Sequence, residues 1–405
     1  MSTLCEADKH SMANERPPFA NPCILDADGL DQLIHSLLAE GYDVLGPRVS
    51  DDAIVYQPVS STADLPAGWT DQQQGGRYRL RRRDDGALFG YVVGPHSWKK
   101  FLYPPARRLW QAERKPRGFR LVPEDLATPK YAFLGVRPCE LHAIAIQDQI
   151  FLHGGYVDPD YKARRENLFI VAVNCTQPGG NCFCASMNTG PKVSSGYDLA
   201  LTELLHDGSH RFLVEVGTER GTRLLAQVPH QVPTAADLAL AAQLLDQAAR
   251  SMGRTLDTRD LKDILYRNSE SPHWDTVAGH CLSCANCTLV CPTCFCATVE
   301  DTTNLTGSHA ERWRRWDSCF TVNFSYIHGG SVRATPRSRY RQWLTHKLAA
   351  WIDQFGTSGC VGCGRCITWC PVGIDITAEA RAIRDSDASS PVSDTSRSPH
   401  DHSHA

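Results

Sequence analysis

The feature that most constrains this chain is a cysteine pattern that occurs twice. Both copies have the spacing C-x2-C-x2-C-x3-C, and a proline follows the last cysteine of each. The eight cysteines are Cys281, Cys284, Cys287 and Cys291 in the first copy and Cys360, Cys363, Cys366 and Cys370 in the second. Four thiolates at this spacing are typical of loops that bind [4Fe–4S] cubes. The fold must therefore arrange two such loops around inorganic clusters.

The spacing also predicts how the two copies share their ligands. Three closely spaced thiolates bind three irons of one cube, and the fourth cysteine points away and completes the other cube. Zinc or purely structural cysteines are the alternative, but zinc sites use cysteine pairs with a longer gap between the pairs. The predicted ligands are Cys281, Cys284, Cys287 and Cys370 for cluster 1, and Cys360, Cys363, Cys366 and Cys291 for cluster 2.

Composition narrows the class of protein. The chain has 405 residues, enough for more than one domain, and its net charge of -3 argues against nucleic-acid binding driven by bulk charge. No apolar run is long enough to cross a bilayer, and the first residues lack the apolar stretch of an export signal. We therefore expect a cytoplasmic protein without a membrane span, whose 17 cysteines serve metal or redox chemistry rather than disulfides.

The texture of the sequence predicts an α+β multidomain fold, in which an N-terminal α/β domain precedes a mostly α-helical dicluster ferredoxin domain. Strand and helix patterns alternate in the first part, and an Ala/Leu-rich helical pattern begins after Thr234, a plausible N-cap. The polar ends of the chain are expected to be disordered. The predicted segments are a disordered N-terminus (1–22), the α/β domain (23–233), the helical domain (234–385) and a disordered tail (386–405).

Particular elements follow from local patterns. The turn "DDG" predicts a hairpin between strands Tyr78–Arg82 and Leu88–Val92. Tyr131–Val136 and Leu168–Val173 read as buried strands with the helix Glu140–Phe151 between them, so these strands should be parallel. The basic-aromatic stretch "ERWRRWDSC" is favoured as one face of a helix, with a partner or nucleic-acid patch as the alternative.

Four cysteines outside the ferredoxin runs fall in the α/β domain: Cys139, Cys175, Cys182 and Cys184. Cys139 and Cys175 follow two strands predicted to be parallel, which places both at the edge of the sheet where ligands gather. Gly179 and Gly180 allow the loop to turn back and approach a cofactor closely. These four thiols could hold a third [4Fe–4S] cluster, or they could lie beside a partner's flavin, or merely pack. Cys294 and Cys296 are competing ligands.

Several segments resemble the beta subunit of cytosolic sulfhydrogenases, the NAD(P)-linked nickel–iron hydrogenases, and are also similar to the dicluster electron-transfer protein of anaerobic sulfite reductases. The segments that carry the resemblance are "GVRPCELHAI", "NCTQPGGNCFCASMNTGP", "GYDLALTE", "CLSCANCTLVCPTCFC", "WDSCFTVNFSYIHGG", "RYRQWLTHKL" and "GCVGCGRCITWCPVGIDI".

The resemblance implies an electron-transfer subunit that connects a flavin/NAD(P)-binding subunit with a hydrogenase or a sulfur or sulfite reductase module. The eight ferredoxin cysteines match the family's ligand positions. No dinucleotide-binding or P-loop motif is present, so no substrate chemistry and no catalytic residue are expected in this chain itself. The alternative is a scaffold or interaction protein whose clusters are structural.

Overall fold

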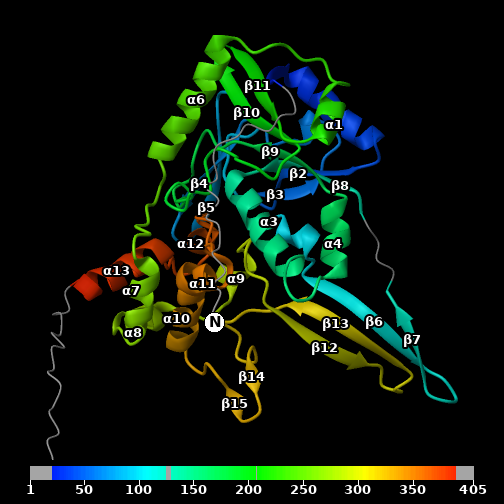
Figure 1. Cartoon of the computed structure of the whole chain (residues 1–405), viewed down its shortest axis with the longest axis vertical. Coiled ribbons are helices and arrows are strands. Elements are labelled where there is room, and N and C mark those ends of the chain that lie inside the picture. Colours follow the sequence, from blue (N-terminus) through cyan, green and yellow to red (C-terminus); the bar gives the residue numbers. More distant parts are fainter. Residues whose placement is uncertain (1–20, 125–128, 207, 389–405) are drawn as a thin grey trace, which may run out of the picture.

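The computed structural model describes residues 21–124, 129–206 and 208–388. Apart from a few residues at their inner edges, the predicted disordered ends lie outside the described residues. A large sheet with its helices forms one end of the molecule, and short helices and loops that carry the ferredoxin cysteines form the other (Figure 1). Helices and sheets are thus mixed, as the sequence predicted.

The large sheet has seven strands in the order β1-β11-β10-β9-β8-β2-β3. Its four central neighbours β10, β9, β8 and β2 run parallel, including the β8–β9 pair that the sequence predicted to be parallel. Parallel strands are covered on both faces, and every residue of β9 is buried. The strands are β1 (Cys23–Asp26), β2 (Asp43–Ser50), β3 (Ala53–Pro58), β8 (Tyr131–Val136), β9 (Phe169–Val173), β10 (Leu199–His206) and β11 (Ser209–Val216).

The helices on this sheet begin at clear signals in the sequence. Pro138 starts the helix between β8 and β9, and Asp26 and Thr218 cap others with their side chains. Thr234 caps α6 through a reciprocal capping box with Asp237, which confirms that predicted N-cap. These helices are α1 (Ala27–Ala39), α2 (Lys99–Leu102), α3 (Pro138–Phe151), α4 (Pro159–Glu166), α5 (Glu219–Leu225) and α6 (Ala235–Arg250).

The predicted "DDG" hairpin is wrong. Strand β5 (Arg77–Arg82) pairs instead with β4 (Trp69–Gln74), because Gly75 and Gly76 make the tight turn just before it. Residues 88–92 form no strand and are buried, and the backbone N–H groups of Leu88 and Phe89 donate to the Glu203 carboxylate at 2.7 and 3.0 Å. A side chain from a distant strand therefore satisfies the backbone groups that a hairpin would have paired.

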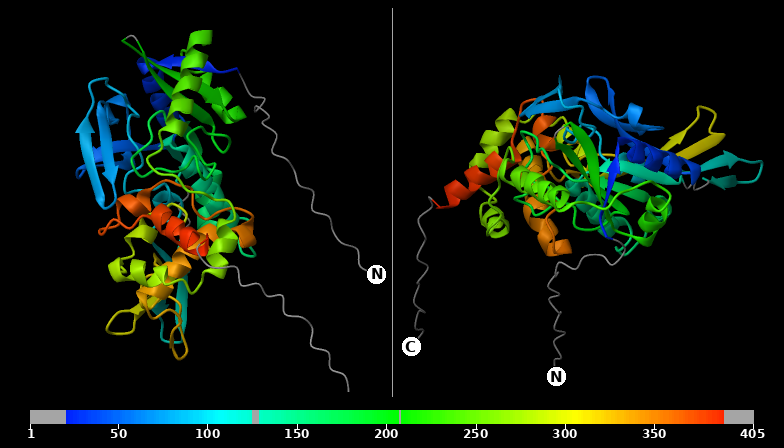
Figure 2. Two further views of the ribbon diagram at one scale, coloured as in Figure 1. Left: turned by 90° about the vertical axis from the view of Figure 1, so that its left-hand side faces the viewer. Right: turned by 90° about the horizontal axis from the view of Figure 1, so that it is seen from above.

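A second sheet forms an arm that projects from the body of the molecule, as the right-hand view of Figure 2 shows. Its order is β12-β13-β6-β7, so strands far apart in the sequence lie side by side. The predicted helix in "ERWRRWDSC" is wrong, because this stretch forms β13 and its arginines pair with carboxylates on neighbouring strands and loops. The strands are β6 (Ala106–Arg114), β7 (Phe119–Pro123), β12 (Ala297–Thr303) and β13 (His309–Trp316).

The cysteine-rich part is built from short helices around an aromatic core that includes Trp274, Phe320, Tyr340 and Trp343. The predicted helix over residues 337–356 is confirmed, with a π-helical turn (His346–Ala350) inside it. A small hairpin of β14 (Tyr326–Ile327) and β15 (Gly330–Ser331) lies beside them. The helices are α7 (Leu261–Arg267), α8 (His273–His280), α9 (Asn286–Leu289), α10 (Pro336–Thr345), α11 (Trp351–Phe355), α12 (Arg365–Thr368) and α13 (Ile376–Ala388).

Contacts cross the predicted domain boundary after residue 233. Helix α6 lies against β10 and β11, and Arg211 forms an ion pair with Asp237 at 2.8 Å. Strand β13 pairs with β6, so "mostly helical" does not describe the strand-containing segment 297–331. The division at residue 233 remains a prediction. Within the described residues, no helix has the length and apolar character needed to span a bilayer.

Candidate iron–sulfur centres

The two cysteine runs form loops with the same backbone conformation. In the first run, Ser283 and Ala285 have φ angles of 52° and 68° and precede α9. In the second run, Gly362 and Gly364 have φ angles of 65° and 74° and precede α12. Left-handed residues at these two places turn each loop around its cysteines. The shared spacing therefore corresponds to a shared local geometry.

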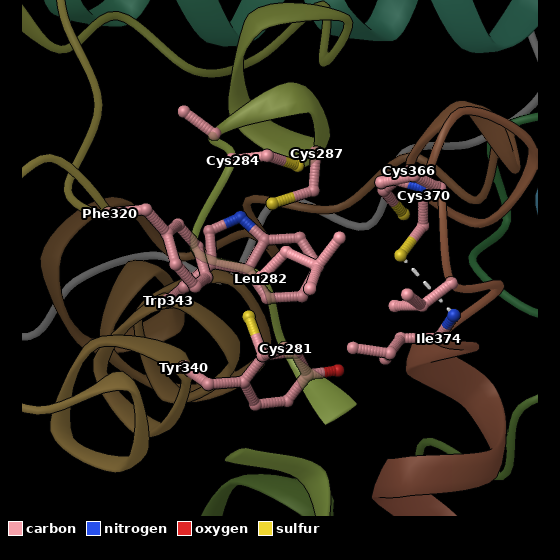
Figure 3. A pocket seen from close by; sticks show the side chains of 13 residues that line it. Cys281, Leu282, Cys284, Cys287, Phe320, Tyr340, Trp343, Cys366, Cys370 and Ile374 are labelled. Carbon is pink, nitrogen blue, oxygen red and sulfur yellow. Dashed lines mark hydrogen bonds between the residues drawn. The ribbon is translucent and has the colours of Figure 1, made fainter. Parts of the chain in front are cut away.

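Cysteines from both runs line one cavity (Figure 3). Cys281, Cys284 and Cys287 lie on one side, and Cys370 lies across from them, as predicted for cluster 1. The unfilled space within this cavity is about 430 Å³ and reaches the solvent. Cys366, which was predicted for cluster 2, also lines it, so the two proposed sites adjoin at this wall.

Apolar and backbone groups complete the cavity. Phe320, Tyr340 and Trp343 form an aromatic wall, and the backbone N–H of Ile374 donates to the Cys370 sulfur at 3.3 Å. An aromatic wall keeps water from a cluster, and an N–H donor stabilises a thiolate. Burial raises the pKa of Cys281, with Cys370 and Cys284 close enough to raise it further. Iron binding would have to offset this cost, because thiolates rather than thiols are the ligands.

The second group gathers around Cys291. Burial raises the pKa of Cys360 to about 12 against the effect of Lys347, and Cys363 and Cys291 lie close enough to raise it further. Cys366 is likewise affected by Cys360, Cys363 and Cys291. The first run's last cysteine thus lies with the second run's first three. Within the described residues, no three His, Cys, Asp or Glu side chains converge as the ligands of a single metal ion.

A buried lysine marks this second group. Lys347 lies in the π-helical turn and is 5 % exposed. Its ammonium donates to the Cys291 sulfur at 3.2 Å and to the Thr293 hydroxyl at 3.0 Å. A positive charge at this place stabilises a thiolate and any anionic cluster that the thiolate binds. Sequence reasoning missed Lys347, because only the fold places it next to Cys291.

The second loop is held firmly by the N-terminal half of the chain. The Phe183 N–H donates to the Gly362 carbonyl at 2.8 Å, and the Thr189 hydroxyl donates to the Val361 carbonyl at 2.7 Å. Arg365 forms a fully buried ion pair with Glu140 at 2.6 Å. These contacts join the second run to α3 and to the loop between β9 and β10.

The four cysteines proposed for a third cluster do come together. Cys139 lies in the first turn of α3 and Cys175 follows β9, at the carboxyl ends of parallel strands as predicted. Burial raises the pKa of Cys182 to about 12, and Cys175 and Cys363 lie close enough to raise it further. Cys184 is affected in the same way by Cys182 and Cys175. This third group therefore adjoins the second loop.

Two details of this third group differ from expectation or were missed. A Cβ on Gly180 would lie 2.3 Å from the Gln73 carbonyl oxygen, so the close approach predicted for this glycine is to backbone and not to a cofactor. Arg137 is 1 % exposed and reaches the Cys175 sulfur at 3.8 Å. It also donates to the carbonyls of Phe89 and Tyr91 at 2.7 and 2.9 Å, so the irregular segment before α2 fixes its position.

A fourth group of thiols contains Cys294, Cys296 and Cys319. Cys294 donates to the Cys291 sulfur, and this contact lowers the pKa of Cys291 more than burial raises it. Cys319 donates to Cys296 and lowers its pKa to about 7, against the effect of burial. Cys294 and Cys296, expected as competing ligands of the third site, thus lie with Cys291 and Lys347 instead. The repeated "CFC" at residues 182–184 and 294–296 was the available signal.

Comparison with known proteins agrees with this geometry. The family described as "4Fe-4S dicluster domain" matches residues 280–374, which contain both cysteine runs. The chain is 34 % identical over 280 residues to sulfhydrogenase 2 subunit beta of Pyrococcus furiosus, a match that covers 68 % of this chain and 79 % of that protein. No solved structure matches the chain. The chain belongs to the family of sulfhydrogenase beta subunits.

Proposed function

We propose that this chain is an electron relay with two [4Fe–4S] clusters inside a hydrogenase-type complex. Cluster 1 is held by Cys281, Cys284, Cys287 and Cys370, and cluster 2 by Cys360, Cys363, Cys366 and Cys291. The observation that carries the proposal is the exchange of last cysteines between the two runs, which creates two adjoining thiolate sites. Adjoining cubes are suited to electron transfer in single steps.

The surroundings of the sites suggest an order along the relay. Cys284 is exposed and Leu282 beside it is 63 % exposed, whereas Cys363 in the second loop is buried. Electrons would enter or leave the chain at cluster 1, where a partner can approach its ligands. Cluster 2 would then pass them inward to the group of Cys139, Cys175, Cys182 and Cys184, for which we propose a third [4Fe–4S] cluster.

The partners that this relay needs are a flavoprotein that binds FAD and NAD(P) and a catalytic hydrogenase or sulfur or sulfite reductase module. The chain itself would perform no substrate chemistry. A cytoplasmic location, where thiols stay reduced, remains a prediction.

The rival function is a scaffold in which the clusters only stabilise the fold. Two features favour the relay. The described residues bring two thiolate sites to a shared wall, which a structural role does not require. A buried lysine and a buried arginine reach cysteine sulfurs, and such charges tune a redox potential.

Anaerobic analysis of the full chain tests the relay. Iron content should be about eight per chain for two cubes and about twelve for three. Both ferredoxin cubes should show electron paramagnetic resonance on reduction, lose it on oxidation by a dye, and regain it in a second cycle. Clusters that are destroyed in the first cycle, or that never reduce, would support the scaffold.

The third cluster has its own control. Cys175→Ser should lower the iron content by about four if the third cube exists. An unchanged content near eight in both proteins removes it and leaves the relay with two carriers. Purification of the native complex, followed by identification of its components, tests the proposed partners.

A further inference from the structure

Two cysteines that the proposed clusters do not use are brought into contact by the arm sheet. Cys296 directly precedes β12, and Cys319 follows shortly after β13. These strands pair, with Ala297 opposite Trp316, and the Asp317 N–H donates to the Cys296 carbonyl at 2.9 Å. The backbone pairing therefore holds the two cysteines close, and their thiols are hydrogen-bonded to each other.

This thiol pair lies between the two proposed cubes. Cys319 packs against the same core as Cys281 and Cys287, and the charge of Cys287 reaches it. Cys296 lies within reach of Lys347, whose ammonium contacts Cys291. One thiol thus faces the ligands of cluster 1, and the other faces the group around cluster 2.

We infer that Cys296 and Cys319 form a reversible dithiol–disulfide couple that exchanges two electrons with the cubes. The inference rests on the proposed function for the source of the electrons. Each of two reduced cubes gives one electron, the S–S bond between the two cysteines breaks, and each sulfur takes up one proton from water. In reverse, the S–S bond forms, two protons leave, and two oxidised cubes are reduced. Iron, sulfur, protons and charge balance without another reagent.

Contact between the two sulfurs favours this couple over another cluster. The ligands of one cube bind different irons, so their sulfurs stand apart around the cluster. A disulfide instead requires two sulfurs that can move directly together.

A second buried lysine supports redox chemistry at this place. Lys99 is 4 % exposed, and its ammonium donates to the carbonyls of Leu289 and Cys294 and lies 3.9 Å from the centroid of the Trp316 ring. Buried ammonium groups held by carbonyls favour nearby anionic sulfur. With Lys347, two positive charges therefore flank the thiols and would stabilise thiolates formed when the disulfide is reduced.

Thiol trapping on the full chain tests the couple. The anaerobic protein is equilibrated in mixtures of reduced and oxidised dithiothreitol, quenched in acid, alkylated under denaturing conditions and digested. A peptide pair linked through Cys296 and Cys319 should form in the oxidising mixtures and disappear in the reducing ones. Both cysteines alkylated in every mixture would overturn the inference.

Electron counting tests the exchange with the cubes. Stepwise reduction with dithionite should consume two more electrons in the oxidised wild-type chain than in Cys296→Ser. Cys23→Ser, which changes a buried cysteine on β1, is the matched control and should behave as the wild type. Equal electron counts in Cys296→Ser and the wild type would overturn the exchange.

Iron content separates the remaining outcome. Cys296→Ser and Cys319→Ser should retain the wild-type iron, because neither thiol is a ligand. A loss of iron would make these cysteines ligands and overturn the couple. If the relay fails because the cubes do not cycle, the linked peptide still forms in dithiothreitol buffers, so the two proposals fail separately.

Discussion

The two cysteine runs share their spacing and backbone turns but lie in opposite surroundings. In the first run Leu282 is 63 % exposed and Cys284 is exposed. At the equivalent place in the second run Val361 is 2 % exposed, and Cys363 is buried. Identical ligand spacing therefore produces one site that a partner can approach and one site enclosed by the rest of the chain.

The residues between the cysteines explain the difference. The left-handed positions hold Ser283 and Ala285 in the first run but Gly362 and Gly364 in the second. A Cβ on Gly364 would lie 2.4 Å from the Asn181 carbonyl oxygen, and one on Gly362 would lie 2.7 Å from the backbone of Cys184. The second run needs glycine less for its φ angle than for the close approach of the loop that carries Cys182 and Cys184. Ligand spacing sets the cluster type, and the intervening residues set the environment.

The largest expected effect comes from breaking the exchange of ligands between the runs. Cys291→Ser should lose cluster 2 while cluster 1 survives, and Cys370→Ser should do the reverse. Each variant should lose about four irons per chain. Iron analysis and electron paramagnetic resonance check this. If Cys291→Ser instead loses the cluster held by Cys281, Cys284 and Cys287, each run holds its own cube and the exchange is wrong.

The next effect concerns the ion pair that fixes the second run to α3. Glu140→Ala leaves the Arg365 guanidinium buried without its carboxylate, and it also removes an acceptor for Tyr56 and Trp98. Losing one partner of a buried pair costs about 3–5 kcal/mol. Denaturant unfolding under anaerobic conditions should show this loss. Arg250→Ala, which removes an exposed pair with Asp246 on α6, is the matched control and should leave the midpoint almost unchanged.

A reciprocal exchange of side chains tests the packing difference directly. Gly364→Ala inserts a methyl group against the Asn181 backbone and should destabilise the chain by about 1–3 kcal/mol. Ala285→Gly in the first run relieves a left-handed alanine and should cost nothing or stabilise slightly. Thermal unfolding of the two variants measures both. Equal losses in the two runs would contradict the proposed difference in enclosure.

The smallest effect concerns the redox potentials. Lys347→Met removes the positive charge 3.2 Å from the Cys291 sulfur and should make the reduction potential of cluster 2 more negative, on the order of 60 mV. The sign follows because a positive neighbour stabilises the more negative, reduced cluster. Potentiometric titration should show a smaller change at cluster 1. Lys262→Met, at a partly exposed pair with Asp353, should shift neither cluster.

Local patterns in the sequence were sufficient for several features. The ligand spacing of each run, the capping box at Thr234 and the strand Tyr131–Val136 all depend on neighbours within a few residues. The parallel β8–β9 pair followed from the helix between its strands, and with it the meeting of Cys139 and Cys175 at one edge. Short-range hydrogen bonds and side-chain periodicity encode such features, so a single sequence is enough to read them.

Tertiary structure alone decided the rest. "ERWRRW" became a strand because β6, distant in sequence, offers it a paired edge, and propensity yields to such pairing. Glu140 and Arg365 are 225 residues apart, and Lys347 and Cys291 are 56 apart, so no local pattern joins them. Enclosure of the second run depends on residues 181–184 packing against two glycines. The sequence by itself determined which cysteines can form cubes, whereas the packing of distant segments determined what surrounds each cube.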